Sequence, residues 1–559
     1  MKSNFSRILV IVGVMVALLC GLSFLQGRMN AVRAEYHLTD TKPLENAPPL
    51  VAFSSVALGG FRGLLADFLW LRVNKKQEEG KYYEMVQLAD WIVKLQPRYT
   101  GAHAFLGWNM AYNISVTFTS FEDRWRWVKR GIELIRDEAM EYNPGDPELY
   151  RQLGWIYEHK MGKDMDDANR YYRVMFAQEM IRLFSDYNAE WEKLDKAPLN
   201  ETKLYATLGD QAAAFQQILA ANNLDFDKFE ILFRERAVIP EDYNGVNLRA
   251  AFDELGITET VELCMRHRWM LYKYRLDPVI MMECNDKYGE LDWRLPEAHA
   301  IYWAERGRRA YTEESQIFKR LNCDRMIFQS LNAAFQTGKL LYLKGDVIDI
   351  RTFEMTPNFA VADATNEYYK QVLRDYPDAQ IAGPYSNFLV DAIVQLYIFG
   401  YQKKAARWFK WAKEFNPSRF PPNADLEEFV TKELAEDMKE ASQQQAQKGI
   451  QSYLYQAFRF LAYATDEESD EYKSFEALTL TAKQLYDHYK KFIGDTALRR
   501  GMPEFDDMRR VMLGTVVSEL RADKATEYLA ENLVRFKGSE IPTEKFIPRA
   551  EEIEVKEVK

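Results

Sequence analysis

The amino-acid sequence predicts an all-α protein. Gly and Pro make up only 46 of its 559 residues, so turns are few and the stretches between them are long. Within these stretches, apolar residues recur at the three- and four-residue spacing of a helix, and the alternation typical of strands is scarce. One pattern of Pro, Leu, Gly and Trp also occurs twice in the same register. Such a repeat predicts a stacked helical array, which can grow to this length without one large core.

The first 34 residues predict a membrane anchor. Residues 8–25 contain no charged side chain, and Lys2 and Arg7 precede them. An uncharged run of this length can span a bilayer as a helix, and no small-x-small cleavage site follows at the usual distance. We therefore expect an uncleaved, single-pass transmembrane helix (a signal anchor), with a cleaved signal as the alternative. The basic amino end favours a cytoplasmic N-terminus, which predicts a bacterial inner-membrane protein with its body in the periplasm.

The stretch around Gly154 organises the rest of the chain. Tyr150, Leu153, Gly154 and Tyr157 have the spacing aromatic-x2-Leu-Gly-x2-Tyr. Large residues three and seven positions apart share one helix face, and the glycine leaves a gap into which a neighbouring helix can press. The same Pro, Leu, Gly and Trp stand 47 residues earlier, in the segment that begins at Pro97. We expect the glycine of each copy to lie at a helix crossing.

This spacing resembles the first helix of a tetratricopeptide repeat (TPR), with Tyr150 where the pattern usually has Trp. Ala405 and Phe409, followed by Pro417, resemble the second helix of the same unit. The resemblance implies a right-handed α-solenoid of helical hairpins, in which the first helices line a concave groove that binds segments of other proteins. The chain as a whole also looks similar to membrane-anchored bacterial TPR-type proteins of undefined function.

Carried over residue by residue, the resemblance places the groove on three helix stripes. The stripes are Arg151, Trp155 and Glu158; Ala104, Trp108 and Ala111; and Val390, Val394 and Tyr397. The residues expected to contact a protein partner are Trp108, Arg151, Trp155, Glu158 and Tyr397. Trp and Arg are the residue types that most often dominate protein interfaces. Packing between repeat units is the alternative for both tryptophans.

Further helices follow from the apolar periodicity and from the prolines that separate units, since proline cannot continue a helix. In chain order, the predicted helices span residues 61–73, 81–95 and 125–142, then one from Pro147, one beginning near Asp166, 211–221, 261–275, one from Pro296, 386–399 and 425–447. Residues 113–124, which are β-branched and polar, and residues 240–247 are predicted loops.

These signals divide the chain into seven segments. Three prolines mark the tether, the repeat register is lost in the middle of the chain, and the carboxyl end is rich in charge. The segments are the anchor 1–34, the tether 35–49, TPR-like repeats 50–184, an irregular helical insertion 185–290, TPR-like repeats 291–422, a C-terminal helical region 423–537, and a charged tail 538–559 expected to be disordered.

The sequence carries no catalytic, cofactor or metal motif. Its six histidines stand singly, and its four cysteines lack the C-x-x-C spacing of metal and redox sites. The net charge of −11 argues against nucleic acid, whose phosphates need a basic face. We therefore predict no catalytic residue, no cofactor, no metal and no small-molecule ligand. A disulfide between Cys264 and Cys284 stays open for an exported body.

Residues 288–307 hold the one stretch with a second interpretation. Glu290, Asp292, Glu297 and Glu305 lie there among aromatic residues. Paired carboxylates in such surroundings hydrolyse glycosidic bonds, so a helical hydrolase of a cell-envelope polymer is the alternative function. Structural ion pairs, with Arg294 and Arg306 as partners, are the other interpretation. The predicted function is a membrane-anchored helical-repeat scaffold that mediates protein–protein interaction or assembles an envelope complex.

Overall fold

The structure is a computed structural model that describes residues 2–35, 61–163, 165–184, 190–310, 317–341, 353–377, 379–399, 401–439, 443–493, 503–521 and 526–536. The described residues are helical almost throughout, which confirms the prediction of an all-α protein. The predicted tether beyond residue 35 and the charged tail lie outside the described residues. The chain divides into two compact units, Met1–Ala102 and His103–Lys559. We describe each unit by itself.

The first unit holds the helices α1 (Lys2–Glu35), α3 (Phe61–Glu78) and α4 (Tyr82–Leu95). Helix α3 runs five residues beyond the predicted end, because four good helix formers, Lys75, Lys76, Gln77 and Glu78, follow Asn74. It stops before Gly80, which has a φ of +67°. Helices α3 and α4 form a hairpin with an apolar seam. The seam contains Ala66, Leu69 and Val73 on α3 and Met85, Leu88, Ala89, Ile92 and Val93 on α4.

Helix α1 covers the segment predicted to span a membrane. Among the described residues, no helix combines the length and the apolar character needed to cross a bilayer.

The next helices, the first of which begins at the end of the first unit, widen into a π-turn in every case but the last. Their bounds are α5 (Thr100–Asn109) with η1 (Met110–Ile114) and η2 (Ser115–Thr117), α6 (Phe121–Glu133) with η3 (Leu134–Ala139) and α7 (Met140–Tyr142), α8 (Pro147–Trp155) with η4 (Ile156–Met161), and α9 (Asn169–Phe184). The predicted loop 113–124 is wrong in part, because the chain stays helical to Thr117. Helix α6 begins at Phe121, where the Ser120 hydroxyl accepts a hydrogen bond from the Asp123 amide.

The glycines of the two repeat copies, Gly107 and Gly154, lie at helix crossings as predicted. A Cβ at Gly107 would stand 2.7 Å from the Ile135 side chain. A Cβ at Gly154 would stand 3.2 Å from the backbone oxygen of Ala300. The neighbour of Gly154 is thus a helix almost 150 residues further along the chain.

The middle of the chain consists of short helices. They are α10 (Trp191–Lys196), α11 (Glu201–Leu208), η5 (Gly209–Gln211), α12 (Ala212–Ala221), α13 (Phe226–Arg236), α14 (Leu248–Glu254), α15 (Thr258–Arg268), η6 (Trp269–Tyr274) and α16 (Pro278–Tyr288). The predicted loop 240–247 is confirmed, and the predicted helices 211–221 and 261–275 correspond to α12 and to α15 with η6. A local cluster of Phe215, Phe229 and Phe252 fills the space between α12, α13 and α14.

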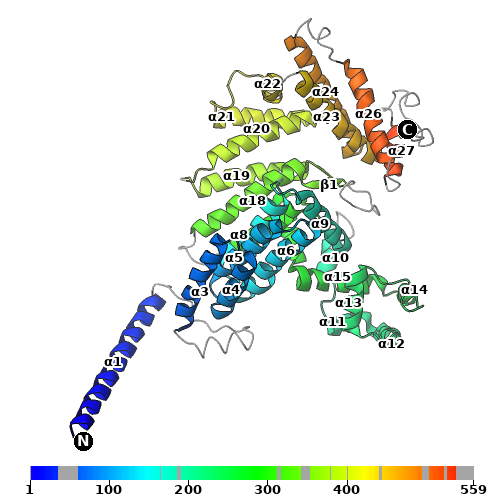
Figure 1. Cartoon of the computed structure of the whole chain (residues 1–559). Helices are drawn as coiled ribbons and strands as arrows, with labels where there is room; N and C mark the ends of the chain where they lie inside the picture. Colours follow the sequence, from blue (N-terminus) through cyan, green and yellow to red (C-terminus); the bar gives the residue numbers. More distant parts are fainter. Residues whose placement is uncertain are drawn as a thin grey trace, which may run out of the picture. The chain divides into compact units, whose positions relative to one another are not determined.

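After this middle section the chain returns to α8. Helix α17 (Pro296–Ala310) begins at the predicted proline and contacts α8, as does α18 (Ile317–Thr337). The contacts then continue in order through α19 (Ala362–Asp375), α20 (Ala382–Ile398) and α21 (Gln402–Phe415), each helix touching the next. Figure 1 shows α8, α18, α19 and α20 following one another in this order. A short antiparallel pair, β1 (Lys339–Leu341) and β2 (Glu354–Thr356), and the turn η8 (Phe359–Val361) lie between α18 and α19 in sequence.

The C-terminal helices are α22 (Leu426–Lys439), α23 (Gln443–Tyr463), α24 (Asp470–Ile493), α26 (Phe505–Arg521) and α27 (Glu527–Arg535). The predicted helix 425–447 corresponds to α22 and the start of α23, with residues 440–442 outside the described residues. Helices α23, α24, α26 and α27 share apolar clusters that include Phe458, Leu461, Leu478 and Val516. The largest core cluster extends instead from Ala104 to Val430. Cys264 and Cys284, for which a disulfide was open, are both free and buried.

Candidate functional site

Two of the predicted groove residues, Trp108 and Trp155, belong to one row of four aromatic rings. Trp108 stacks on Tyr112 with 5.2 Å between ring centroids, and Trp155 stacks on His159 with 4.4 Å. Tyr112 and His159 join the two pairs, since their rings lie 5.8 Å apart and the Tyr112 hydroxyl is 3.2 Å from His159 Nδ1. We call Trp108, Tyr112, His159 and Trp155 the aromatic ladder.

The aromatic ladder is built from equivalent positions of the repeat. Trp108 and Trp155 are 47 residues apart, and so are Tyr112 and His159. Each pair spans the junction between an α-helix and a π-turn, α5 with η1 and α8 with η4. Residues four apart lie on one face of a helix, and the π-turn keeps the residue four places after each Trp on the face of that Trp. The repeat therefore extends to the backbone geometry that orients the rings.

A cavity of about 380 Å³ opens beside the aromatic ladder. Its wall includes Trp108, Tyr112 and His159, all half-buried. Its exposed rim includes Val116 and Met165, which are 50% and 69% exposed. The remaining lining residues are Asn113, Arg124, Lys160, Asp166 and Asp167. This volume is in the range of pockets that take one large side chain or a small molecule.

The charged residues of this cavity neutralise one another. Lys160 is buried beneath Tyr112, with its Nζ 5.2 Å from the ring centroid, and pairs with Asp166. Arg124 pairs with both Asp166, at 3.0 Å, and Asp167. Burial raises the pKa of Asp166, but the hydrogen bonds from Lys160 and from the Ala168 amide, together with the charge of Lys160, outweigh burial and the pKa falls to about 2. Burial also lowers the pKa of His159, which keeps the aromatic ladder uncharged at neutral pH.

The other predicted groove residues lie outside the aromatic ladder. Arg151 is half-buried and makes a bidentate pair with Glu148 at 2.6 and 2.9 Å. Glu158 is only 1% exposed; one carboxylate oxygen pairs with Lys163 at 2.9 Å, and the other has no hydrogen-bond partner among the described residues. Tyr397 is half-buried on α20, with α18 and α19 between it and α8 in the order of contacts.

The stripe residues without charge are mostly covered as well. Ala104, Ala111 and Val390 are buried, and Val394 is partly buried against the large core. Sequence reasoning thus finds the two tryptophans and misses Tyr112 and His159. The signal that could have found these two is their shared spacing, four residues after each Trp in both copies.

The carboxylates of residues 288–307 are mainly buried in ion pairs. Asp292 pairs with Arg294 at 2.8 Å, as one interpretation of the sequence predicted. Glu297 pairs with Arg173 at 3.1 Å, and burial raises its pKa. Glu305 accepts hydrogen bonds from Lys287, Tyr288 and Arg309.

Arg306 is not the partner of these carboxylates. Its guanidinium lies 5.0 Å from the ring centroid of Trp303 and donates to the backbone oxygen of Arg275. The prediction that Arg306 pairs with an acid of this stretch is therefore wrong, because the aromatic faces around α17 hold the cation. Glu290 alone among the four carboxylates is exposed.

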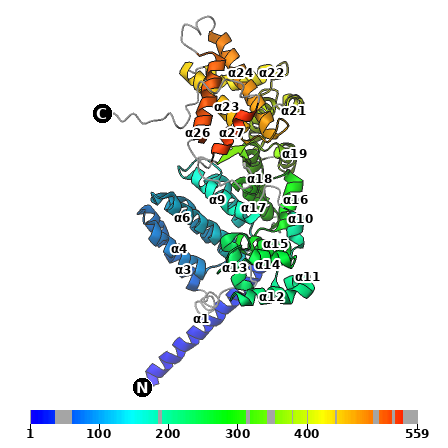
Figure 2. The same ribbon diagram turned by 90° about the vertical axis from the view of Figure 1, so that its right-hand side faces the viewer.

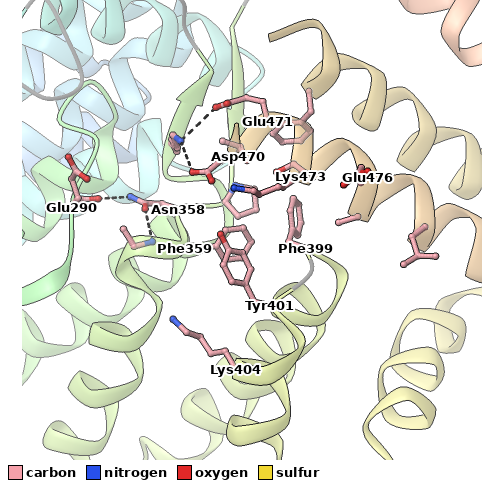
Figure 3. Close-up of a pocket in the computed structure, with 18 residues that line it drawn as sticks. Glu290, Asn358, Phe359, Phe399, Tyr401, Lys404, Asp470, Glu471, Lys473 and Glu476 are labelled. Atoms are coloured by element: carbon pink, nitrogen blue, oxygen red, sulfur yellow. Dashed lines mark hydrogen bonds and ion pairs between the residues drawn. The ribbon is translucent and has the colours of Figure 1, made fainter. Parts of the chain in front are cut away.

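Glu290 lies at a second, larger cavity of about 720 Å³. Figure 3 shows its aromatic wall, in which Phe359 is 4.7 Å from Tyr401 and 5.1 Å from Phe399 between ring centroids. Charged residues of both signs complete the lining: Glu290, Lys339, Lys404, Asp470, Glu471, Lys473 and Glu476. The sequence holds no signal for this cavity, because its residues come from separate elements between positions 290 and 480.

Comparison with models of protein families, with curated protein sequences and with solved structures finds no match to this chain. The arguments for function therefore rest on the residues and their geometry.

Proposed function

We propose that the protein is a TPR-like helical-repeat scaffold that binds a protein partner at the aromatic ladder. The observation that carries this proposal is the ladder itself. Two repeat copies present the same Trp and the same π-turn, and their four rings form one half-buried row beside an open cavity. Half-buried aromatic residues in pockets are the usual anchors of protein interfaces.

The order of helix contacts supports a solenoid. From α8 the contacts pass to α18, α19, α20 and α21 in turn, and each helix touches its neighbour. Helices α17 and α18 also pack on α8 directly, so the short helices between residues 185 and 290 leave the array and the chain then returns to it. This arrangement agrees with an insertion in a right-handed stack of hairpins, as the TPR resemblance implies.

The charges of the cavity favour an uncharged segment of the partner. Lys160, Arg124, Asp166 and Asp167 are engaged with one another, so no net charge is left to attract an ion. The exposed rim of Val116 and Met165 adds apolar surface. A large apolar side chain of the partner fits this cavity and can pack against the aromatic ladder.

The membrane location is part of the same proposal. Residues 8–25 anchor the chain in a bacterial inner membrane, and the body faces the periplasm, where it assembles an envelope complex. The support is the uncharged run of sequence and, in α1, exposed apolar side chains that include Val14, Leu18, Leu22 and Phe24.

The test is substitution of one ladder ring. Trp155→Ala should weaken capture of the partner from the membrane fraction by about 2 kcal/mol or more, the usual threshold for a residue that dominates an interface. Trp91→Ala is the control, because Trp91 is 55% exposed on α4 and should leave capture unchanged. The competing account makes Trp155 a core residue, and it predicts a loss of roughly 3–5 kcal/mol of stability. A well-folded Trp155→Ala protein with undiminished capture contradicts the proposal.

A hydrolase of a cell-envelope polymer is the second candidate, and one observation favours it. Glu290 lies at the 720 Å³ cavity with Asp470, Glu471 and Glu476, beside aromatic rings that suit a sugar face. Paired carboxylates across such a cavity are the groups that glycoside hydrolysis needs. Glu290→Gln separates the candidates, since it removes a hydrolase activity and leaves partner capture at the aromatic ladder intact.

A further inference from the structure

Helix α3 is apolar on two faces, and the second face has no cover among the described residues. The inner face, Ala66, Leu69 and Val73, is buried against α4. On the outside, Leu64, Phe68 and Leu71 are 67%, 55% and 72% exposed. These three residues have the spacing i, i+4, i+7 and so form one stripe of the helix, which we call the outer stripe.

Each apolar face of a helix normally lies against apolar surroundings. The seam with α4 covers the face of α3 that carries Ala66, Leu69 and Val73. In the part of the chain that the structure describes, the outer stripe is therefore a row of large apolar side chains in contact with water, which costs free energy.

The charge of the chain indicates what covers the outer stripe. In the first unit, Lys and Arg outnumber Asp and Glu by 12 to 8, whereas the chain as a whole has a net charge of −11. The basic residues Arg72 and Lys75 are exposed directly beside the carboxyl end of the outer stripe. Exposed apolar residues flanked by Lys and Arg have the chemistry that anionic lipid headgroups and the acyl chains beneath them attract.

We propose that α3 lies on the surface of an anionic lipid bilayer, with Leu64, Phe68 and Leu71 in the boundary between headgroups and acyl chains. Asp67 is exposed beside the outer stripe, so α3 lies at headgroup depth and does not cross the bilayer. This contact rests on the proposed membrane location and deepens it, because α3 then fixes the first unit against the same bilayer that residues 8–25 enter. It is independent of the aromatic ladder.

Environment-sensitive fluorophores on single cysteines in the full chain test the proposal. Native Cys20 is exposed on α1 and reports on the anchor. Leu71→Cys, in a Cys20→Ser background, reports on the outer stripe, and Gln87→Cys, exposed on α4, is the matched control. The three other cysteines do not interfere, because they are buried and burial raises the pKa of each thiol to about 12. The probe is a vesicle of phosphatidylcholine and phosphatidylglycerol.

The expected result is a blue shift of emission at position 71 on reconstitution with vesicles, and none at position 87. The shift at position 71 should shrink in vesicles of phosphatidylcholine alone and disappear when Phe68→Asp is added. Phe68 is more than half exposed, so this variant should keep the melting temperature of the parent protein.

The three labels also separate this inference from the anchor. A shift at Cys20 with position 71 left in water overturns the inference and leaves the anchor standing. A shift at position 71 without one at Cys20 supports the outer stripe and overturns the anchor. No shift at either position overturns both. A shift at position 71 that survives Phe68→Asp also overturns the inference, since the fluorophore then inserts without the stripe.

Discussion

At the scale of single residues, the π-turn η4 decides which side chains the proposed groove presents. An α-helix has about 3.6 residues per turn, which puts Trp155 and Glu158 on one stripe. The π-turn rotates less per residue, which carries Glu158 further from Trp155, and Glu158 is buried; His159, four places after Trp155, stacks on it. No residue type specifies a π-turn. The two tryptophans could therefore be predicted from the sequence, and the spacing shared by both copies could have found their partners, whereas the burial of Glu158 could not be predicted.

Burial of His299 predicts a loss of stability in acid. His299 lies between Tyr157 and Phe176, with Nε2 donating to the backbone oxygen of Trp293, and burial lowers its pKa to about 4. In the unfolded chain its pKa is about 6.5, so between these values the unfolded state binds more protons. The free energy of unfolding should therefore fall, by up to about 3 kcal/mol from this residue, as the pH drops from 6.5 towards 4.

Urea titrations across this pH range measure the effect. His299→Phe keeps a ring against Tyr157 and Phe176 but cannot titrate, so its unfolding free energy should depend less steeply on pH. His488→Phe, at an exposed position on α24, controls for the loss of a histidine. If the curves of His299→Phe and of the parent protein run parallel, the inferred burial of a neutral imidazole is wrong.

At the scale of elements, the sequence predicts the helix crossings at the glycines, but it does not predict the short strand pair. Gly107 and Gly154 follow a leucine in a helical pattern, and both lie where a helix approaches. The pair of β1 and β2 escapes prediction, since each strand has three residues and no alternation long enough to detect. The strand pair is stabilised by Leu340 and Leu341, whose side chains are buried in two apolar clusters. These contacts come from distant parts of the chain, so the local sequence pattern does not reveal them.

The glycines at the α5–α6 crossing predict a graded series of destabilisation. A Cβ at Gly131 would stand 2.6 Å from the backbone oxygen of Gly107, which cannot move without the helix. A Cβ at Gly107 would meet the Ile135 side chain, which can shift. Gly131→Ala should therefore cost more stability than Gly107→Ala, both within about 1–3 kcal/mol by overpacking. Gly154→Leu, with Ala300 and Met326 in its way, should cost a similar amount.

Thermal melts of the single variants measure this series. Gly145→Ala is the control, because no described atom beyond its chain neighbours lies within 4 Å of a Cβ at that position. It should melt as the parent protein does. Equal melting temperatures for Gly131→Ala and Gly145→Ala mean that the two helices do not cross at the glycines.

At the scale of the whole molecule, the repeat is readable in sequence but its continuation is not. The register stops near residue 185 and a proline restarts a helix at Pro296. No sequence pattern between residues 185 and 296 predicts that α17 packs against α8. The close approach of Gly154 to Ala300, and of Gly307 to Tyr150, shows that it does. Small residues on both helices permit this approach. The sequence therefore predicts that a helix packs at these residues, but it does not predict which helix.

The proposed membrane location predicts the side on which the second unit lies. Lys2 and Arg7, with the free amino group, precede residues 8–25 and should hold the N-terminus in the cytoplasm. A reporter that is active only in the cytoplasm, fused after Lys559, should then be silent, and one that is active only outside should respond. Exchanging Lys2 and Arg7 for Glu removes the positive charge that favours a cytoplasmic N-terminus. The activity of the cytoplasmic reporter should then rise and that of the external reporter should fall. Clear cytoplasmic activity in the parent fusion reverses the assignment, because the body then stays on the side where its amino end begins.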